Sequence, residues 1–406
     1  MLQRNFIRER FITGLVLLCV CAPLYASPSL ANFMQKVWEK TPAILAAESA
    51  LEAVKARKLA ANQPIYNPEL DVELERTDIN KLGIGISQRV DWGNKRIAAT
   101  GKAEADIQLA LAEVVIQRQT LAEEILNALV DRQAAHQLQN LAQQRLGLMQ
   151  DFVDNTEQRQ QAGDIGLQDV MLARVALSEA KMQLANYAAQ QAANEAKLQA
   201  ASGLFVNDWP ALTQEPPAVT QVVKLETFQE QLPRLNALRA KLAAAKSNVN
   251  LSRATQKSDP NFGLRGGMEG SDVLIGLSFS MPLYVRNRFR AEVAVANQEA
   301  LQIEQLLLSA THRARVHLNG SYQRYQLTYT AWQAWKQTGL NTLNEQLKLI
   351  QTLWKSGEMS TADYLVQAKQ NVDAQETAVS LSTQMWQAWI AWLSASGQIE
   401  QWLTSN

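Results

Sequence analysis

The stretch Leu82–Arg96 reads LGIGISQRVDWGNKR and places a short alternating strand directly before a long helical segment. A second stretch of the same kind, Leu274–Arg288, reads LIGLSFSMPLYVRNR. The flanking residues also correspond: Asn67-Pro68-Glu69-Leu70 matches Asp259-Pro260-Asn261-Phe262, Gly163–Asp169 matches Gly357–Asp363, and Ala201-Ser202-Gly203 matches Ala395-Ser396-Gly397. Because the matches extend along most of the chain, the sequence predicts a duplication of one structural unit.

Residues 1–26 read as a secretory signal peptide. Arg4, Arg8 and Arg10 precede an apolar run over 11–22, and Ala26 offers a small residue for cleavage. The alternative is an N-terminal membrane anchor, but a run of about 12 apolar residues is short for spanning a bilayer. Both cysteines, Cys19 and Cys21, lie in this segment, so we expect no disulfide in the mature chain.

The predicted organisation is a signal peptide over 1–26, a first repeat over 27–203, a connection over 204–227 and a second repeat over 228–406. The connection contains Pro210, Pro216 and Pro217. The whole sequence has 39 basic and 39 acidic residues. This balance does not support nucleic-acid binding or a polybasic membrane patch.

Each repeat contains two segments in which apolar and polar residues alternate. In the first, Leu70, Val72 and Leu74 alternate with Glu69, Asp71, Glu73 and Glu75. This period of two indicates a strand with one apolar and one wet face. The pattern recurs over 82–86, 262–268 and 273–281, with turns expected over 78–81 and 270–272. We therefore predict two hairpins, with strands of about ten residues.

These hairpins need a partner, because two strands are marginal in water and their edges are open. Strands of about ten residues with one apolar face fit a membrane β-barrel. Four strands cannot close a barrel, but three copies of the chain would supply twelve. Trp92 and Tyr284 follow the two exit strands, where a membrane interface favours aromatic residues. The alternative is a small soluble sheet packed on helices.

Long helical runs follow the hairpins, over 94–160 and 286–355, and return over 166–201 and 360–396. At 1.5 Å per residue each long run extends on the order of 100 Å. Apolar residues spaced by three and four, such as Ala142, Leu146, Met149 and Val153, indicate coiled-coil seams. Shorter helices are expected over 30–62 and 225–256. The fold class is mainly α, a duplicated helix-strand-strand-helix unit with its helical turns farthest from the strands.

With these features the chain resembles the outer membrane efflux protein family, the TolC-like channels of Gram-negative bacteria. The resemblance rests on the duplicated unit, on Pro42 and Pro233 at helix starts, on the Asn-Pro and Asp-Pro strand entries, and on the two Gly-x5-Asp turns. Ser87–Arg96 is most similar to the Ser-Gln-x-x-Glu-x-Gly-Gly-Lys-Arg motif of the CzcC-like heavy-metal branch. Asp91 replaces the Glu of that motif, and Asn94 replaces its second Gly.

The resemblance implies a homotrimer with a twelve-stranded barrel in the outer membrane and a helical tunnel across the periplasm. The tunnel would meet a periplasmic membrane-fusion adaptor and an inner-membrane, proton-driven pump of the RND type. The implied cargo is heavy-metal cations of the cobalt, zinc and cadmium type, and no cofactor is implied. One alternative is the same duct for drugs, dyes or other organic solutes. Another is a soluble periplasmic coiled-coil scaffold.

The resemblance places Asp363 in a carboxylate ring at the narrow periplasmic aperture, where three copies would attract cations. The alternative is a helix N-terminal Asp favoured by the macrodipole. Asp169 is the equivalent residue of the first repeat, which family members often bond to a basic or phenolic side chain. Met359 and Trp354 stand at those partner positions, and Met cannot pair with a carboxylate.

Two further sets of residues are candidates. Gly163 and Gly357 provide tight turns, and Asp164 and Glu358 beside them are adaptor contacts or simply solvated tips. Glu69, Asp71, Glu73 and Glu75 would face the barrel lumen if the alternating leucines and valine face lipid. The alternative is an ordinary solvated face.

Nothing in the sequence suggests catalysis or a metal site. It has no nucleophile elbow and no phosphate-binding loop. His312 and His317 are separated by about 140° around a helix, and His136 belongs to the other repeat. Trp386, Trp389 and Trp392 form a stripe that we expect to pack between helices.

Overall fold

The computed structural model describes residues 29–76, 80–205, 209–213, 215–217 and 232–405. The predicted signal peptide, residues 78–79 of the expected first hairpin turn and part of the inter-repeat connection, with the expected helix start over 225–231, lie outside these ranges. Asn80 and Lys81, also expected in that turn, belong to β2. The elements in chain order are α1 (Leu30–Lys40), α2 (Pro42–Ala61), β1 (Glu69–Arg76), β2 (Asn80–Arg89), α3 (Lys95–Ala162), α4 (Leu167–Ser202), α6 (Pro233–Thr255), β3 (Asn261–Glu269), β4 (Asp272–Ser280), α7 (Arg290–Lys355), α8 (Thr361–Ser396) and α9 (Ile399–Ser405).

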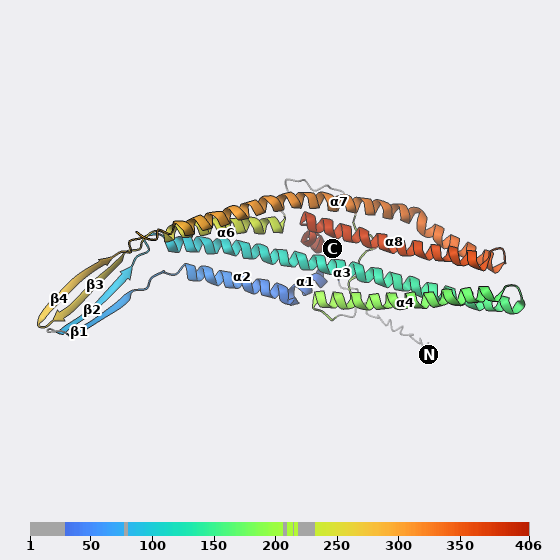
Figure 1. Cartoon of the computed structure of the whole chain (residues 1–406), viewed down its shortest axis with the longest axis horizontal. Helices are drawn as coiled ribbons and strands as arrows, with labels where there is room; N and C mark the ends of the chain where they lie inside the picture. Colours follow the sequence, from blue (N-terminus) through green and yellow to red (C-terminus); the bar gives the residue numbers. More distant parts are fainter. Residues whose placement is uncertain (1–28, 77–79, 206–208, 214, 218–231, 406) are drawn as a thin grey trace, which may run out of the picture.

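The molecule is long and narrow, with the strands at one end and the helical turns at the other (Figure 1). The two longest helices, α3 and α7, connect these ends. On the strand side they pack with α2 and α6, and on the far side with α4 and α8. The duplicated, mainly helical architecture predicted from the sequence is therefore confirmed. In the described part of the chain, no helix has the combination of length and apolar character that crossing a membrane requires.

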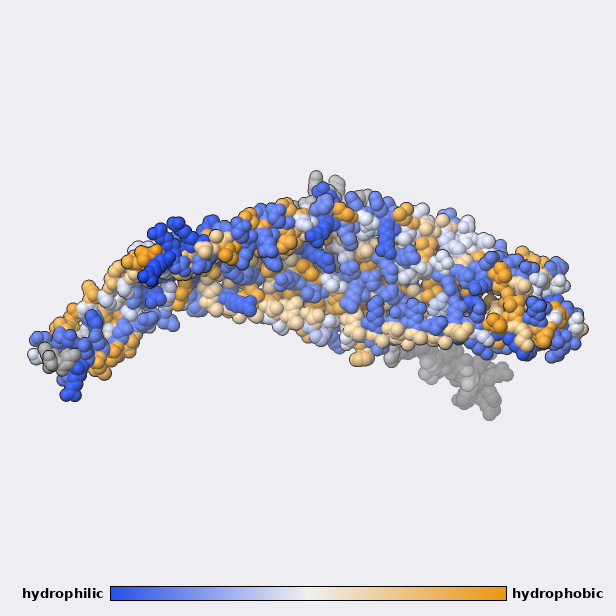
Figure 2. All heavy atoms as spheres, viewed as in Figure 1, coloured by the Kyte–Doolittle hydropathy of each residue, from blue (hydrophilic) through white to orange (hydrophobic). Residues whose placement is uncertain are grey.

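The four strands form one antiparallel sheet in the order β1-β2-β3-β4. Its register aligns apolar residues in rows across the sheet. One row joins Leu70, Ile86, Leu264 and Leu277. These side chains are exposed, with Leu277 at 87% and Leu70 at 70%. Figure 2 shows hydrophobic residues along the strand end of the molecule. The predicted apolar face exists, and nothing within the described chain covers it.

The strand register corrects how the two copies correspond. Glu69 pairs with Ser87, whereas Asn261 pairs with Ser280, so the second hairpin is one residue longer. The structural counterpart of Leu82 is therefore Ile275, not Leu274 as direct superposition of the two sequences suggests. Because a one-residue shift turns a side chain to the other face, Leu274 lies on the polar face.

The long helices end at glycines, as predicted. Gly163 has φ 86° and Gly357 has φ 81°, a left-handed conformation that favours glycine. In each turn the next N–H bonds back to a carbonyl of the last helical turn: Asp164 N donates to Arg159 O, and Glu358 N donates to Leu353 O. This Schellman arrangement satisfies carbonyls that the helix end leaves free.

The helical pattern expected over 30–62 forms two helices rather than one, and the helix start predicted at Pro42 is confirmed. Thr41 is extended, with φ −74° and ψ 122°, and separates α1 from α2. Pro42 is the cause, because its ring disfavours a helical conformation for the residue before it and suits the first position of a new helix.

The largest buried cluster lies midway along the molecule, where α1, α8 and α9 meet α3. It includes the predicted tryptophan stripe of α8, in which Trp386 is 3% and Trp389 is 2% exposed. Trp402 of α9 packs edge-on against Trp389 at 4.6 Å. The stripe is therefore helix packing, while α9 was not expected from the sequence.

Candidate functional site

The polar face of the sheet carries the four acidic residues predicted for a lumen. Glu69, Asp71, Glu73 and Glu75 pair with Ser87, Gly85, Gly83 and Lys81 of β2. All four side chains are exposed. Because Gly83, Gly85 and Ser87 stand opposite three of them, these three acidic side chains border an open surface, whereas Glu75 stands opposite Lys81.

Two cations on the same face were missed in the sequence. Arg265 of β3 reaches across β2 to Glu73, with Nη1 at 2.9 Å from Oε2. A Cβ on Gly83 would lie 3.5 Å from Glu73 Cβ, so the bare backbone of β2 leaves room for this pair. Near the end of the hairpin, Lys81 Nζ lies 3.0 Å from Glu269 Oε1. Both cations stand at polar positions of the alternating pattern, which is the signal that could have located them.

The elbow between β2 and α3 explains the residues of the heavy-metal-type motif. Asp91 caps α3, because its Oδ1 accepts from Lys95 N at 2.8 Å and its Oδ2 from Arg96 N at 2.9 Å. Asn94 has φ 58°, which turns the chain into the helix. A Cβ on Gly93 would lie 2.8 Å from the carbonyl oxygen of Ala254, so only glycine fits there. These motif residues form a structural joint.

Asp259 joins the two repeats at this elbow. Its carboxylate is 3% exposed, and Oδ2 accepts hydrogen bonds from Tyr66 Oη and Lys95 Nζ, both at 2.6 Å. Burial raises the pKa of Asp259, but the hydrogen bonds from Lys95 and Tyr66 outweigh it and hold that pKa below its usual value. Burial and the bond to Asp259 raise the pKa of Tyr66 to about 12. We call Tyr66, Lys95 and Asp259 the elbow link.

The two predicted interface aromatics differ in their surroundings. Trp92 is 65% exposed directly after β2. Tyr284 is half-buried and packs edge-on against Phe289, with ring centroids 5.0 Å apart. Trp92 N donates to Val90 O, and the matching bond after β4 runs from Val285 N to Leu283 O. Val285, which is 74% exposed, is therefore the structural counterpart of Trp92.

At the opposite end of the molecule, the two candidate aperture carboxylates cap helices. Asp169 Oδ2 accepts from Gly166 N at 3.3 Å at the start of α4. Asp363 N donates to Ser360 Oγ at 3.1 Å, and Ser360 Oγ donates to Asp363 Oδ2 at 2.6 Å. Asp363 is exposed and Asp169 is half-buried. Both therefore satisfy the helix N-termini within one chain, and their aperture role stays a prediction.

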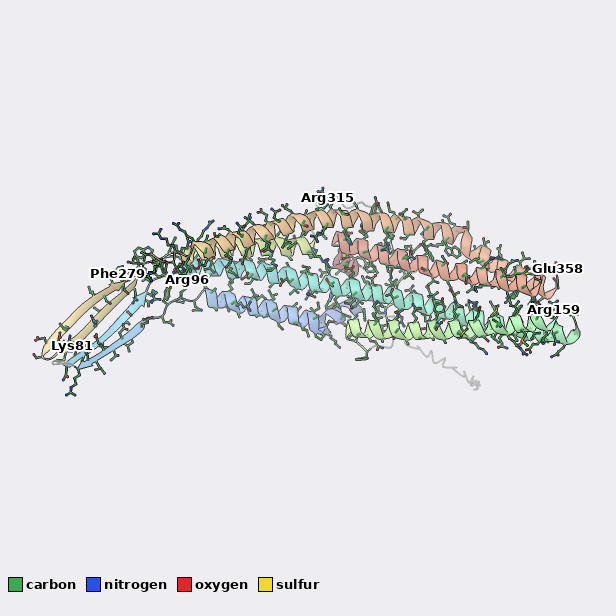
Figure 3. All side chains as sticks on the ribbon, in the orientation of Figure 1. Lys81, Arg96, Arg159, Phe279, Arg315 and Glu358 are labelled. Carbon is green, nitrogen blue, oxygen red and sulfur yellow. The ribbon has the colours of Figure 1, made fainter. Side chains whose placement is uncertain are left out.

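The four candidate adaptor-contact residues lie in the turns at this end. Gly163 and Asp164 are exposed between α3 and α4, as are Gly357 and Glu358 between α7 and α8. Figure 3 labels Glu358 and Arg159 here, and Arg96, Phe279 and Lys81 toward the strand end. The structure thus places the predicted tips farthest from the sheet, where a partner protein could reach them.

An aromatic cluster links the two helical hairpins near these turns. Phe152 of α3, Trp354 of α7 and Tyr364 of α8 are each 2–3% exposed, and their ring centroids are separated by 4.7 to 5.1 Å. Arg159 Nη1 donates to the carbonyl oxygen of Trp354 at 3.2 Å, and the Arg159 guanidinium lies over the indole. We call Phe152, Trp354 and Tyr364 the tip cluster. Trp354 therefore faces α3 rather than Asp169.

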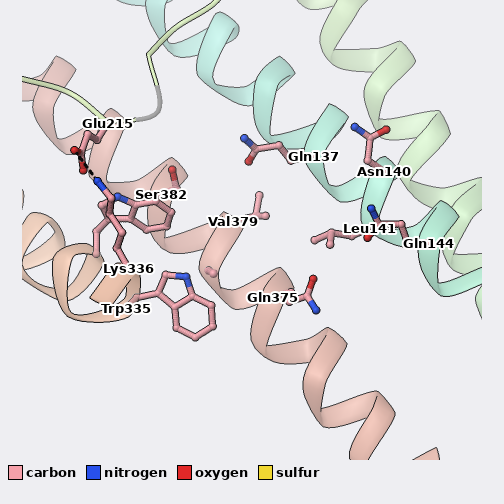
Figure 4. A pocket seen from close by; sticks show the side chains of 12 residues that line it. Gln137, Asn140, Leu141, Gln144, Glu215, Trp335, Lys336, Gln375, Val379 and Ser382 are labelled. Atoms are coloured by element: carbon pink, nitrogen blue, oxygen red, sulfur yellow. Dashed lines mark hydrogen bonds and ion pairs between the residues drawn. The ribbon is translucent and has the colours of Figure 1, made fainter. Parts of the chain in front are cut away.

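A cavity of about 440 Å³ lies in the wall between α3, α7 and α8. Figure 4 shows Trp335, Gln375 and Val379 around it, with Glu215 beside Lys336 at its rim. Glu215 accepts from Lys336 Nζ at 3.1 Å and from Gln333 Nε2 at 2.8 Å. The Lys336 bond is the main reason that the pKa of Glu215 is lowered. The cavity has no counterpart among the residues predicted from the sequence.

Within the described ranges, no group of three or more His, Cys, Asp or Glu side chains is arranged to hold a metal ion. The four acidic residues of β1 are spread along that strand, and the sheet also carries Glu269 of β3 and Asp272 of β4.

The comparisons with known proteins agree with this geometry. Residues 34–204 match the family model described as outer membrane efflux protein. No curated protein sequence matches the chain. Among solved structures, CusC superposes with a TM-score of 0.78 at 14% identity, covering 91% of this chain and 92% of its own.

Two further structures are similar. The outer membrane protein VceC from Vibrio cholerae superposes with a TM-score of 0.72 at 17% identity, over 91% of this chain and 96% of its own. The open-state MtrE outer membrane channel of Neisseria gonorrhoeae gives 0.76 at 16% identity, over 92% and 89%. Residues 34–204 are therefore similar to the outer membrane efflux protein family, and the chain shares its fold, across both repeats, with solved outer-membrane channels.

Proposed function

We propose that three copies of this chain form an outer-membrane channel whose helices extend into the periplasm. The observation that carries the proposal is the uncovered apolar face of the sheet. Its edge strands also have unpaired outer edges among the described strands: β1 pairs only with β2, and β4 pairs only with β3. Nine residues of β3 span roughly 30 Å, which matches the hydrocarbon core of a bilayer. Closing the sheet with further copies pairs the edges, as a lipid environment requires.

The channel would act as the exit duct of a tripartite efflux system. Its exposed helical turns would meet a periplasmic membrane-fusion adaptor, which connects the duct to an inner-membrane pump of the RND type. The solved channels with this fold support the assignment at the level of the fold.

We further propose heavy-metal cations of the cobalt, zinc and cadmium type as cargo. Support comes from the acidic residues of β1 on the polar face of the sheet and from the Ser87–Arg96 motif. Tripled in a barrel, the acidic rows would favour cations over anions.

Two experiments test these proposals. Outer-membrane fractions should contain a heat-sensitive trimer band on a detergent gel, and a soluble periplasmic monomer would contradict the channel. A deletion strain complemented with the wild-type gene should be compared across zinc, cobalt, cadmium, nickel and copper gradients and across dyes and detergents. Sensitivity to a subset of metals is expected. Sensitivity to dyes and detergents alone would overturn the metal cargo and leave the channel standing.

A further inference from the structure

The sheet has two edge strands, β1 and β4. In the described chain β1 and β4 each have one neighbour, whereas β2 and β3 have two. The β2–β3 contact joins the first structural unit to the second. In a closed assembly, β4 of one copy and β1 of the next would join the second unit to the first, so the duplication supplies a template for the seam between copies.

The register of this template fixes which residues correspond. Leu70 corresponds to Phe262, because both follow the matched Asn-Pro and Asp-Pro entries by two residues. Leu70 pairs with Ile86, and Phe262 pairs with Phe279. Ile86 therefore corresponds to Phe279, and by the same alignment Leu264 corresponds to Val72.

Ile86 pairs with Leu264 across the β2–β3 contact. We propose that β4 pairs with β1 of the next copy with Phe279 opposite Val72 and Leu277 opposite Leu74. This inference rests on the proposed channel and specifies its partner surface: a second copy of the chain, in one register.

The faces of the sheet provide an independent check. In this register apolar side chains meet apolar side chains, while Ser278 falls opposite Glu73 and Ser280 opposite Asp71. A slip of one residue would place Phe279 against an acidic side chain and turn the apolar rows of one copy toward the polar face. The matching alternation was not used to derive the register, and it excludes every slip by an odd number of residues.

The seam between copies lacks the two links found inside the chain. At the elbow, the position of Asp259 is taken by the exposed, neutral Asn67. At the tips, the sequences of the two repeats can be aligned at Gly163 and Gly357. In this alignment Phe152 corresponds to Gln346, and Trp354 corresponds to Gln160. At these positions the seam would therefore lack the carboxylate of the elbow link and two aromatic rings of the tip cluster.

Disulfide cross-linking tests the register. The only cysteines, Cys19 and Cys21, lie in the predicted signal peptide. In the mature chain a disulfide would therefore come only from the introduced cysteine pair. Phe279→Cys with Val72→Cys, and separately Leu277→Cys with Leu74→Cys, should give covalent trimers on non-reducing gels of outer-membrane fractions. The offset control, Phe279→Cys with Leu74→Cys, should cross-link at least about tenfold less, because a diagonal separation exceeds disulfide reach.

The outcomes separate the register from the channel itself. Efficient cross-linking of the offset pair but not the predicted pairs would overturn the register and leave the trimer standing. Absence of any cross-link between copies, together with a monomer that does not enter the outer membrane, would overturn both.

A variant that introduces the missing carboxylate at the seam tests the inferred absence of the elbow link between copies. Asn67→Asp would place a carboxylate where the preceding copy, which contributes β4 to the seam, presents Arg286, Arg288 and Arg290, and should raise the temperature at which the trimer dissociates. Asn250→Asp makes the same charge change on α6 and should leave that temperature unchanged. An Asn67→Asp trimer that dissociates at the wild-type temperature would overturn the inferred gap in the seam.

Discussion

Lys95 Nζ lies 2.6 Å from Asp259 Oδ2 and joins the first turn of α3 to the residue that precedes Pro260 and β3. The two side chains are only 13% and 3% exposed, so this pair is screened little by solvent. It connects the two repeats at the elbow, between the sheet and the long helices. Loss of this pair should therefore weaken the contact between the repeats, and not only the turn in which one of the two residues lies.

The first prediction concerns removal of this carboxylate. Asp259→Asn leaves a mostly buried ammonium without its partner and should destabilise the folded chain by about 3 kcal/mol. The measurement is a denaturation midpoint in detergent. Asp259→Asn with Lys95→Met should recover part of the loss, because the unpaired charge is gone. Lys55→Met, which breaks only an exposed pair with Glu52, serves as the control and should cost under about 1 kcal/mol.

The elbow link also predicts how stability depends on pH. The pKa of Tyr66 is raised to about 12 in the folded chain, above its ordinary value near 10. Its contribution is therefore fully present below about pH 10 and is lost as the pH rises toward 12. The unfolding midpoint of the wild type should fall across this window more than that of Tyr66→Phe. Parallel curves for the two proteins would contradict this role of Tyr66.

At the acid end the sign is opposite. The folded pKa of Asp259 is lowered, so its contribution is present above the ordinary Asp value of about 3.9 and is lost as the pH falls through the lower folded value. Wild type should lose more stability than Asp259→Asn on acidification below about pH 4. A matched titration of both proteins by tryptophan fluorescence gives the comparison.

Two adjacent glycines of β3 offer a sharp test of the sheet. A Cβ on Gly267 would clash with the carbonyl oxygen of Leu82, whereas a Cβ on Gly266 meets nothing closer than 4.0 Å. Gly267→Ala should therefore disturb the β2–β3 contact and reduce the yield of trimer in the outer membrane several-fold. Gly266→Ala should assemble like the wild type. Equal yields for the two variants would contradict the register of this contact.

The proposed aperture can be separated from helix capping. Asp363→Asn removes the charge at nearly constant size, and Ser360→Ala removes the hydroxyl cap while it keeps the carboxylate. If three Asp363 side chains set selectivity, Asp363→Asn should reduce the preference for cations in bilayer recordings, and Ser360→Ala should not. Unchanged selectivity in Asp363→Asn would leave Asp363 as a capping residue only.

The tip cluster should hold the helical turns of one chain together. Trp354→Ala removes a side chain that is 2% exposed and should cost about 3–5 kcal/mol, because it leaves a cavity among Phe152 and Tyr364. We expect more frequent spontaneous opening in bilayer recordings. Trp335→Ala, at a half-buried site that lines the cavity between α3, α7 and α8, is the control, and equal opening in both variants would show that the cluster does not hold the tip.

The sequence by itself determined the duplicated unit, the apolar alternation of the strands, the long helices and the glycine turns. Each depends on a short-range periodicity of apolar residues or on a residue, such as glycine or proline, that restricts the backbone conformation. Both effects act over a few neighbouring positions. It also located the acidic residues of β1, whose common face follows from a period of two.

Tertiary structure decided what depends on distance between segments. The one-residue difference between the hairpins moved the counterpart of Leu82 to Ile275, and only strand pairing revealed it. The bonds of Asp259 to Lys95 and Tyr66, the reach of Arg265 to Glu73, and the contact of Phe152 with Trp354 join residues that are far apart in the chain. No local pattern encodes such contacts, because they exist only once the helices and strands are packed in a particular register.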